Sequence, residues 1–347
     1  MQGMLEGFEA PSTRSTDVAR VLVDVDLPHM DRPLDYIVPA GLADAAVVGS
    51  LVRVRLSSAR IDGWIVERTR REVGEGTASL ESVVSSTPVL APSIYETARR
   101  IAARFLATTS QVLSLAIPPR HARAEREARD ENAPTWPTVT SDHVGLGWEA
   151  YPAGEAFVSR LRAGESPRAI ATMLRPYLRG CLSEAVASTV ASRRSVIVVT
   201  ATGEQAGRYA RELSEDLSIP VSLAGSEVAA EKRYRLHVAA SLGRVPVVVG
   251  TRSAVWVPCS RLGLIIIVDD GDDRLRERRF PRCDALDVAV QRCAVEGSGL
   301  LVASSARSVK AQALVRSGWA VGIEPTPQAL REATPRVHLH GSTQAER

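Results

Sequence analysis

The chain has 347 residues, of which 45% are hydrophobic, enough to bury a substantial core in about two domains. A formal net charge of +3 permits contact with nucleic acid without arguing strongly for it, because acidic residues nearly balance basic ones. The first 17 residues lack the pattern of a secretory signal, and no apolar run approaches the roughly 18 residues of a membrane span. We therefore expect a cytoplasmic protein without membrane contact.

In chain order, residues 1–17 are predicted to be disordered and residues 18–117 to form a compact β-rich domain. Hydrophobic residues alternate with polar ones from Val21 to Val25 and from Leu51 to Leu56, and residues 61–67 supply another strand. Prolines and glycines between these runs are typical of the tight turns of an antiparallel sheet. A helix closes the domain, with Ser93 and Glu96 as its predicted capping box.

Residues 118–150 are rich in proline and charge without sustained periodicity, which favours a largely exposed linker. From 151 to 324, strands and helices alternate, as in a parallel sheet covered on both faces. Residues 325–347 are interpreted as a tail without a clear core. The predicted helices are 179–192, 204–217, 227–242, 284–296 and 307–317, and the predicted strands are 195–200, 220–224, 246–250, 262–268 and 299–303.

The cysteines show no C-x-x-C pair and no histidine at ligand spacing, so we expect buried, reduced thiols and no zinc or other metal site. Nearly all of the basic residues are arginines, and several of these arginines are clustered. The four cysteines are Cys181, Cys259, Cys283 and Cys293, and the clusters are Arg99, Arg100 and Arg104; Arg120, Arg123, Arg126 and Arg129; and Arg274, Arg276, Arg278 and Arg279.

A buried apolar strand, Leu262 to Val268, is followed by four carboxylates: Asp269, Asp270, Asp272 and Asp273. Such a strand end normally holds Mg²⁺ against a nucleotide, and its partner is a G-x-x-x-x-G-K-[ST] loop that cradles the phosphates. The only lysines, Lys232 and Lys310, follow no glycine, and the planar guanidinium of arginine does not replace a lysine ammonium there. We expect no ATP hydrolysis by this chain and predict no cofactor, while binding of a nucleotide without turnover stays open.

Several segments resemble the PriA (primosomal protein N′) family of replication restart proteins. In the first domain these are Arg32 to Pro39, which follows Leu27-Pro28, then Val48 to Arg55, Gly63 to Glu67, and Pro118-Pro119-Arg120. In the second they are Val247 to Ser253 and Leu262 to Asp273. The resemblance covers most of residues 18–322. It implies a 3′ DNA-binding domain followed by a degenerate, RecA-like first helicase lobe that lacks the P-loop.

The resemblance further implies that Leu34, Asp35 and Tyr36 capture the 3′ end of the nascent leading strand at a stalled fork. A carboxylate can accept hydrogen bonds from a free 3′-hydroxyl and a base edge while rejecting a phosphate, so Asp35 would select for ends. The alternative from the sequence alone is that Asp35 caps a turn between Pro33 and Pro39.

By the same resemblance, Gly250, Thr251 and Arg252 would bind the DNA backbone through N–H groups, a hydroxyl and a guanidinium. A glycine after an apolar strand also marks ordinary turns, so this assignment depends on its position before the acidic strand.

Three departures from the family pattern bear on mechanism. Residues 169–180, upstream of the first predicted helix of the lobe, contain neither a glycine run nor a lysine. The family's Asp-Glu-x-His-Asp box becomes Asp269-Asp270-Gly271-Asp272-Asp273, a degenerate Walker B segment without the histidine. The second lobe, the zinc-binding region and the C-terminal domain find no counterpart in this sequence.

This pattern resembles a helicase-deficient branch of the family. We therefore expect a fork-binding initiator of replication restart rather than a motor. Its expected partners are forked DNA with a free 3′ end, primosome components and the replicative helicase.

Other functions remain open from the sequence. Asp270-Gly271-Asp272 could be the D-x-D site of a Mg²⁺-dependent phosphotransfer enzyme. In a haloacid-dehalogenase-like fold, Thr or Val is expected where Arg274 stands, and a topoisomerase-primase-like fold needs an upstream glutamate that we cannot identify. An active helicase would need the missing loop. Finally, the four aspartates could simply form surface ion pairs with the arginines that follow them.

Overall fold

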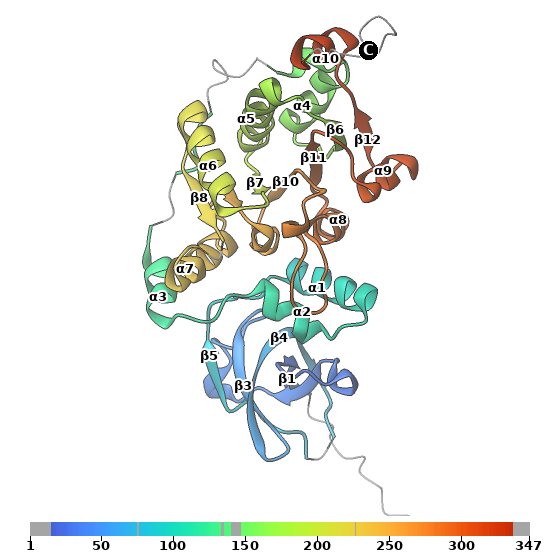
Figure 1. Cartoon of the computed structure of the whole chain (residues 1–347). Helices are drawn as coiled ribbons and strands as arrows, with labels where there is room; N and C mark the ends of the chain where they lie inside the picture. Colours follow the sequence, from blue (N-terminus) through green and yellow to red (C-terminus); the bar gives the residue numbers. More distant parts are fainter. Residues whose placement is uncertain (1–14, 75, 133–134, 140–146, 226, 336–347) are drawn as a thin grey trace, which may run out of the picture.

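The computed structural model describes residues 15–74, 76–132, 135–139, 147–225 and 227–335. Most of the predicted disordered N-terminus, residues 1–14, lies outside the described residues, whereas Thr16 and Asp17 already belong to the first strand. Figure 1 shows the N-terminal sheet at one end of the molecule, a layer of helices next to it, and a larger lobe beyond. No helix among the described residues is long and apolar enough to cross a membrane.

The N-terminal domain is a five-stranded sheet whose strand order is β2-β1-β4-β3-β5, with antiparallel pairing throughout. Alternating valines on β1 and β3 bury one face of this sheet, and the turn between β3 and β4 places Ser57 at a left-handed φ of 56°. The predicted β-rich domain is confirmed. Its strands are β1 (Thr16–Val23), β2 (Leu34–Ile37), β3 (Leu51–Leu56), β4 (Ala59–Arg71) and β5 (Ser82–Ser85), with short 3₁₀ turns η1 (Pro28–Met30) and η2 (Ala40–Leu42).

Three helices follow: α1 (Pro92–Phe105), α2 (Thr109–Ala116) and α3 (Ala122–Asp130). The predicted capping box of α1 is wrong. The N-cap is Ala91 without a side-chain cap, because Pro92 can start the helix with its fixed φ and no N–H to satisfy. The prediction of an exposed linker at 118–150 is wrong for α3, whose small residues Ala124 and Ala128 are buried and which packs against α7 (Ala230–Ser241).

The lobe is a seven-stranded parallel sheet in the order β12-β6-β11-β10-β7-β9-β8. Helices cover both of its faces, so the predicted parallel α/β architecture is confirmed. The strands are β6 (Arg168–Thr172), β7 (Ser195–Val199), β8 (Val221–Ala224), β9 (Val247–Gly250), β10 (Leu262–Val268), β11 (Gly299–Ser304) and β12 (Val321–Ile323).

The predicted helices of the lobe are present, although the first of them begins four residues earlier than expected. The helices are α4 (Gly154–Arg162), α5 (Arg175–Ala191), α6 (Gly203–Leu217), α7, α8 (Ala285–Glu296), α9 (Val309–Arg316) and α10 (Pro327–Ala333), with 3₁₀ turns η4 (Trp148–Ala150), η5 (Arg252–Trp256) and η6 (Asp273–Leu275). Helices α4, α5 and α6 pack on one face of the sheet, and α7, α8 and α9 pack on the other. The tail assignment is wrong for α10, where Ala329 is buried. The four cysteines are buried and free, as predicted.

The two domains share one hydrophobic core, since residues of α1 and α2 belong to the same cluster as residues of α7 and α8. Polar contacts also join the two domains along this interface, which we call the seam. The buried carboxylate of Glu125 on α3 accepts hydrogen bonds from Ser85 Oγ at 2.7 Å, Arg120 Nε at 2.8 Å and Tyr234 OH at 3.1 Å. His237 on α7 donates its Nε2–H to the carbonyl oxygen of Val89 at 2.7 Å. The seam therefore fixes how the N-terminal sheet sits on the lobe.

Candidate nucleic-acid interface

Asp35 lies in the middle of β2 and opposite Arg20 of β1. Its carboxylate pairs with Arg71 of β4 and lies 3.8 Å from Arg20 Nε, which is buried and has no hydrogen-bond partner among the described residues. Arg20 in turn contacts Glu67 at 2.9 Å. The Asp35 side chain keeps 38% of its surface exposed. Because Asp35 belongs to a strand and is held by arginines, the turn-capping alternative is wrong.

The two neighbours of Asp35 in the predicted triad point away from it, because successive side chains of a strand face opposite sides of the sheet. Tyr36 is only 3% exposed, its hydroxyl donates to the Arg55 carbonyl oxygen at 3.3 Å, and burial raises its pKa. Leu34 packs against the same core. Of the three residues, only Asp35 offers a functional group on the exposed face of the sheet.

Gly250, Thr251 and Arg252 lie at the carboxyl end of β9, where ligands of parallel sheets bind. A Cβ on Gly250 would lie 1.7 Å from the Ala224 carbonyl oxygen, so only glycine fits there. The Thr251 N–H already donates to that oxygen at 3.0 Å. Arg252 Nε donates to Glu277 at 3.2 Å. Thr251 and Arg252 line a pocket of about 370 Å³ between the lobe and the end of α2.

The carboxylates of the acidic strand end have different partners. Asp270 accepts hydrogen bonds from Ser304 Oγ at 2.7 Å and from the Ser308 hydroxyl, and Ser308 also caps α9. Asp272 caps η6, and both of its oxygens are bound by Arg274 at 2.6 and 2.9 Å, which holds the pKa of Asp272 below its usual range. Two of the four carboxylates therefore have structural partners.

The other two carboxylates differ in position. Asp269 directly follows β10 with a left-handed φ of 54° and lines a pocket of about 500 Å³ whose walls include Met173 and Arg175. Asp273 is exposed. Among the described residues, no group of three or more histidine, cysteine or acidic side chains could hold a metal ion. Because Asp270 and Asp272 are turned toward different partners, the D-x-D phosphotransfer alternative gains no support.

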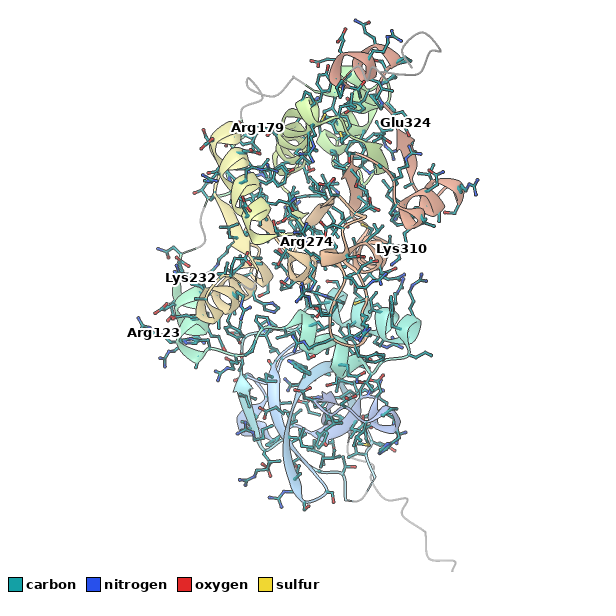
Figure 2. The ribbon with its side chains drawn as sticks, in the orientation of Figure 1. Arg123, Arg179, Lys232, Arg274, Lys310 and Glu324 are labelled. Atoms are coloured by element: carbon teal, nitrogen blue, oxygen red, sulfur yellow. The ribbon has the colours of Figure 1, made fainter. Side chains whose placement is uncertain are left out.

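The place of a phosphate loop, between β6 and α5, is occupied by only Met173 and Leu174. The Leu174 N–H donates to Tyr151 OH at 2.9 Å, and Pro176 stands in the first turn of α5, so this connection differs from a glycine-rich loop with free backbone N–H groups. Figure 2 shows the two lysines on opposite sides of the lobe, Lys232 on α7 and Lys310 on α9, with Arg274 between them. Neither lysine stands in for the lysine of such a loop.

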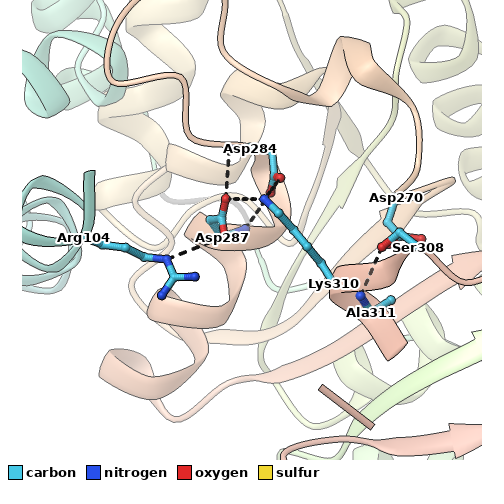
Figure 3. A network of polar contacts seen from close by, with 7 residues as sticks. All are labelled: Arg104, Asp270, Asp284, Asp287, Ser308, Lys310 and Ala311. Atoms are coloured by element: carbon cyan, nitrogen blue, oxygen red, sulfur yellow. Dashed lines mark hydrogen bonds and ion pairs between the residues drawn. The ribbon is translucent and has the colours of Figure 1, made fainter. Parts of the chain in front are cut away.

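Lys310 instead pairs with Asp284 and, at 2.7 Å, with Asp287, two residues of the α8 capping box (Figure 3). Arg104 of α1 lies 3.9 Å from Asp287 and so extends this network into the N-terminal domain. These pairings could not be predicted from the sequence, because they join helices far apart in the chain.

Comparison with known proteins assigns the chain. Residues 20–118 match the family model described as the 3′ DNA-binding domain (3′BD) of PriA. Over 318 residues the chain is 37% identical to the probable replication restart protein PriA of Mycobacterium tuberculosis, in a match that covers 90% of this chain and 48% of that protein. The chain belongs to the PriA family. It spans about half the length of the curated PriA relatives that it matches first.

A more distant relative is the replication restart protein PriA of Treponema pallidum, 33% identical over 93 residues, which are 27% of this chain and 14% of that protein. Among solved structures, RecG bound to a three-way DNA junction matches with a TM-score of 0.37 and 15% identity, over 68% of this chain and 30% of that one. The PriA assignment places Asp35 within the matched 3′BD, whereas the acidic strand end lies in the lobe beyond it.

The sequence did not predict which residues surround Asp35 and Arg252. Arg20 and Arg71 stand beside Asp35 only because β1 and β4 pair with the register that the structure shows. The alternation of β1 does indicate which residues share a face, and in that way points to Arg20 but not to Arg71. Glu277, the partner of Arg252, lies in a segment without periodicity, so no local pattern could have found it.

Proposed function

We propose that this chain recognises the free 3′ end of the nascent leading strand at stalled or abandoned replication forks. This recognition promotes primosome assembly and loading of the replicative helicase. The observation that carries the proposal is the exposed carboxylate of Asp35 on the outer face of a PriA-type 3′BD.

The chemistry of Asp35 supports selection for a hydroxyl end. A carboxylate accepts a hydrogen bond from a 3′-hydroxyl and repels a 3′-phosphate. Arg20 and Arg71 offset part of its negative charge and thereby lower the cost of bringing a DNA strand close. Both ion pairs are partly exposed, so their rearrangement around a ligand costs little.

We further propose that the lobe acts without ATP-driven unwinding. The two-residue connection between β6 and α5 and the structural bonds of Asp270 support this proposal. An ATPase assay with and without single-stranded DNA tests it, and the expected result is no DNA-stimulated hydrolysis. A rate that rises with added single-stranded DNA would overturn this part of the proposal.

End selection is tested by fluorescence anisotropy on two forks that differ only in a 3′-hydroxyl or a 3′-phosphate on the leading strand. We expect tighter binding to the hydroxyl end, on the order of tenfold, since a charged hydrogen bond is worth about 1.5 to 3 kcal/mol. Asp35→Ala should erase the difference.

Asp62→Ala is the matched control. Asp62 is a similarly exposed aspartate of the same sheet, paired with Arg53 at 2.7 Å, and its removal should leave the preference intact. Equal affinity of the wild-type protein for both ends would refute end selection.

A further inference from the structure

A cavity of about 650 Å³ lies at the amino ends of the lobe strands. On the lobe side, Arg194 directly precedes β7, Arg261 directly precedes β10, and Gly297 lies two residues before β11. The facing wall comes from the 3′BD, through the segment from Pro88 to Ser93, which includes the start of α1. The cavity therefore lies at the opposite edge of the sheet from Asp269 and from the end of β9. We call it the amino-edge cavity.

Two arginines lie side by side in the amino-edge cavity. Leu262 of β10 pairs with Ser195 of β7. Arg261 and Arg194 are the residues just before this pair, so they are neighbours across the sheet. Burial lowers the pKa of Arg194, and the positive charge of Arg261 lowers it further. Like charges that are close together repel each other, and an anion bound between the two guanidinium groups would relieve this repulsion.

Neither of these arginines is paired with a carboxylate in the part of the chain that the structure describes. Arg194 is half-buried and donates only to neutral groups, namely the hydroxyls of Ser192 at 3.3 Å and Ser166 at 3.1 Å and a backbone carbonyl oxygen. The exposed guanidinium of Arg261 makes no hydrogen bond or ion pair with the described residues. The charges of both side chains are therefore available to an anionic ligand.

The acidic groups of the amino-edge cavity do not cancel this positive charge. Glu296 lines the cavity, but its two carboxylate oxygens accept hydrogen bonds from the fully buried Arg292 at 2.6 and 3.2 Å. Cys259 also lines the cavity, and burial raises the pKa of its thiol to about 12, so the thiol is uncharged near neutral pH. The cavity therefore carries an excess of positive charge.

The remaining walls of the cavity combine apolar surface with free hydroxyls. Pro88, Pro92 and Pro258 supply apolar surface. The hydroxyls of Ser93 and Ser260 have no hydrogen-bond partner among the described residues. The N-cap of α1 has no side-chain cap, so the positive end of this helix adds to the field of the two arginines. Mostly apolar walls with a few polar groups, around a volume of this size, are typical of small-molecule sites.

We propose that the amino-edge cavity binds a small phosphate monoester, with its phosphate between Arg194 and Arg261 and its apolar part against the prolines. Guanidinium groups bind phosphate oxygens through charge-assisted hydrogen bonds of matching geometry. The inference goes beyond the recognition of DNA, because neither Asp35 nor the end of β9 contributes to this cavity. Since the walls come from both domains, a bound ligand stabilises the seam between them.

Isothermal titration calorimetry on the full chain tests the proposal with AMP, inorganic phosphate and adenosine as probes. AMP should bind more tightly than phosphate, because it adds an apolar part, and adenosine should not bind measurably. Arg261→Gln should weaken AMP binding on the order of tenfold, since it removes a charge-assisted hydrogen bond. The matched control is Arg175→Gln, because Arg175 is also an exposed arginine but lines the pocket at the opposite edge of the sheet. This control should keep the wild-type affinity.

Thermal unfolding supplies a second measurement. Because Arg261 is exposed and without a partner among the described residues, Arg261→Gln should unfold at the wild-type temperature when no ligand is added. Saturating AMP should raise the midpoint of wild type and of Arg175→Gln, but not that of Arg261→Gln. The preference for a 3′-hydroxyl fork should be the same in all three proteins, so a failure here is separate from a failure of end selection.

Four results would overturn the proposal. The first is the absence of saturable binding of AMP and of phosphate to wild type. The second is adenosine binding as tight as that of AMP, because the phosphate would then not be recognised. The third is loss of AMP binding in Arg175→Gln and not in Arg261→Gln, which would place the ligand at the carboxyl edge. The fourth is displacement of AMP by oligo-dT, which would make the cavity a contact for DNA.

Discussion

Asp35 lies on β2 and Asp270 in the turn after β10, and the partners of these two carboxylates differ in kind. Asp35 is held by two long arginine side chains from neighbouring strands, and the pair remains open to water. Asp270 is held by the hydroxyls of Ser304 and Ser308, one of which also caps a helix. Exposed ion pairs are worth about 0 to 1 kcal/mol and can be exchanged for a ligand, whereas a helix cap and buried hydroxyls are tied to the fold.

An acidic residue is therefore available for binding only when its partners can release it. Asp35 of the 3′BD is such a carboxylate. At the acidic strand end of the lobe, Asp270 is fixed by two hydroxyls, whereas Asp269 faces a pocket.

A substitution in the seam between the two domains should cause the largest loss of unfolding free energy. Glu125→Ala removes the acceptor of Ser85, Arg120 and Tyr234, which leaves buried donors and a cation without a partner. Arg120 can turn its partly exposed side chain to water, but each buried hydroxyl left without this acceptor costs about 1 to 3 kcal/mol. Urea unfolding should show this loss. Glu127→Ala is the control on the same helix, because Glu127 pairs with Arg123 at the surface, and it should leave the unfolding curve close to that of wild type.

The second contact of the seam makes stability depend on pH. The pKa of His237 is lowered from 6.5 to about 4 by burial, so the folded state holds the neutral ring while the unfolded chain takes up a proton below pH 6.5. Stability from this group is present above pH 6.5 and is lost as the pH falls toward 4. A shift of this size corresponds to about 3 kcal/mol.

Unfolding free energies measured at several pH values for wild type and His237→Gln isolate this effect. The glutamine amide can still donate to Val89 but does not titrate, so its curve should be flatter between pH 6.5 and 4. Parallel curves for the two proteins would show that His237 is not the source of the pH dependence.

The acidic strand end should contribute to the stability of the fold and not to the recognition of DNA ends. Asp270→Ala leaves the hydroxyls of Ser304 and Ser308 without their shared acceptor, and we expect a loss of about 2 kcal/mol in unfolding free energy. Asp273→Ala is the control, since Asp273 is an exposed member of the same segment. Both variants should retain the preference for a 3′-hydroxyl. A change of that preference in Asp270→Ala would contradict the expectation that Asp270 has a structural role only.

Most of the lobe could be predicted from the sequence, because long apolar strands alternate there with amphipathic helices. The strand β6 could not, since the alanines of Arg168–Thr172 carry little hydrophobic signal and the strand is buried by its neighbours. The helix α3 was also missed, because the buried face that it packs against α7 consists of alanines and a glutamate, which carry little hydrophobic signal. Short elements of this kind depend on tertiary packing, which a local pattern does not record.

The candidate site was predictable only in part, for a related reason. Asp35 and the segment Gly250 to Arg252 were found through short motifs that are contiguous in the chain. Their partners Arg20, Arg71 and Glu277 come from other elements, and the pairing of β1 with β2 and β4 decides which of them meet. Short motifs therefore predicted the positions of the candidate residues. Their ion-pair partners and their exposure to solvent could be seen only in the folded structure.

The smallest change in stability should come from the residue with the largest proposed role in recognition. Asp35→Ala leaves Arg20 and Arg71 without their carboxylate, but Arg71 remains in contact with water and Arg20 keeps Glu67 at 2.9 Å. We therefore expect a loss of less than about 1 kcal/mol in urea unfolding, together with complete loss of the preference for a 3′-hydroxyl end. If Asp35→Ala instead destabilises the protein as much as Asp270→Ala does, the arginines beside Asp35 are structural partners. The distinction between an exchangeable and a fixed carboxylate then fails.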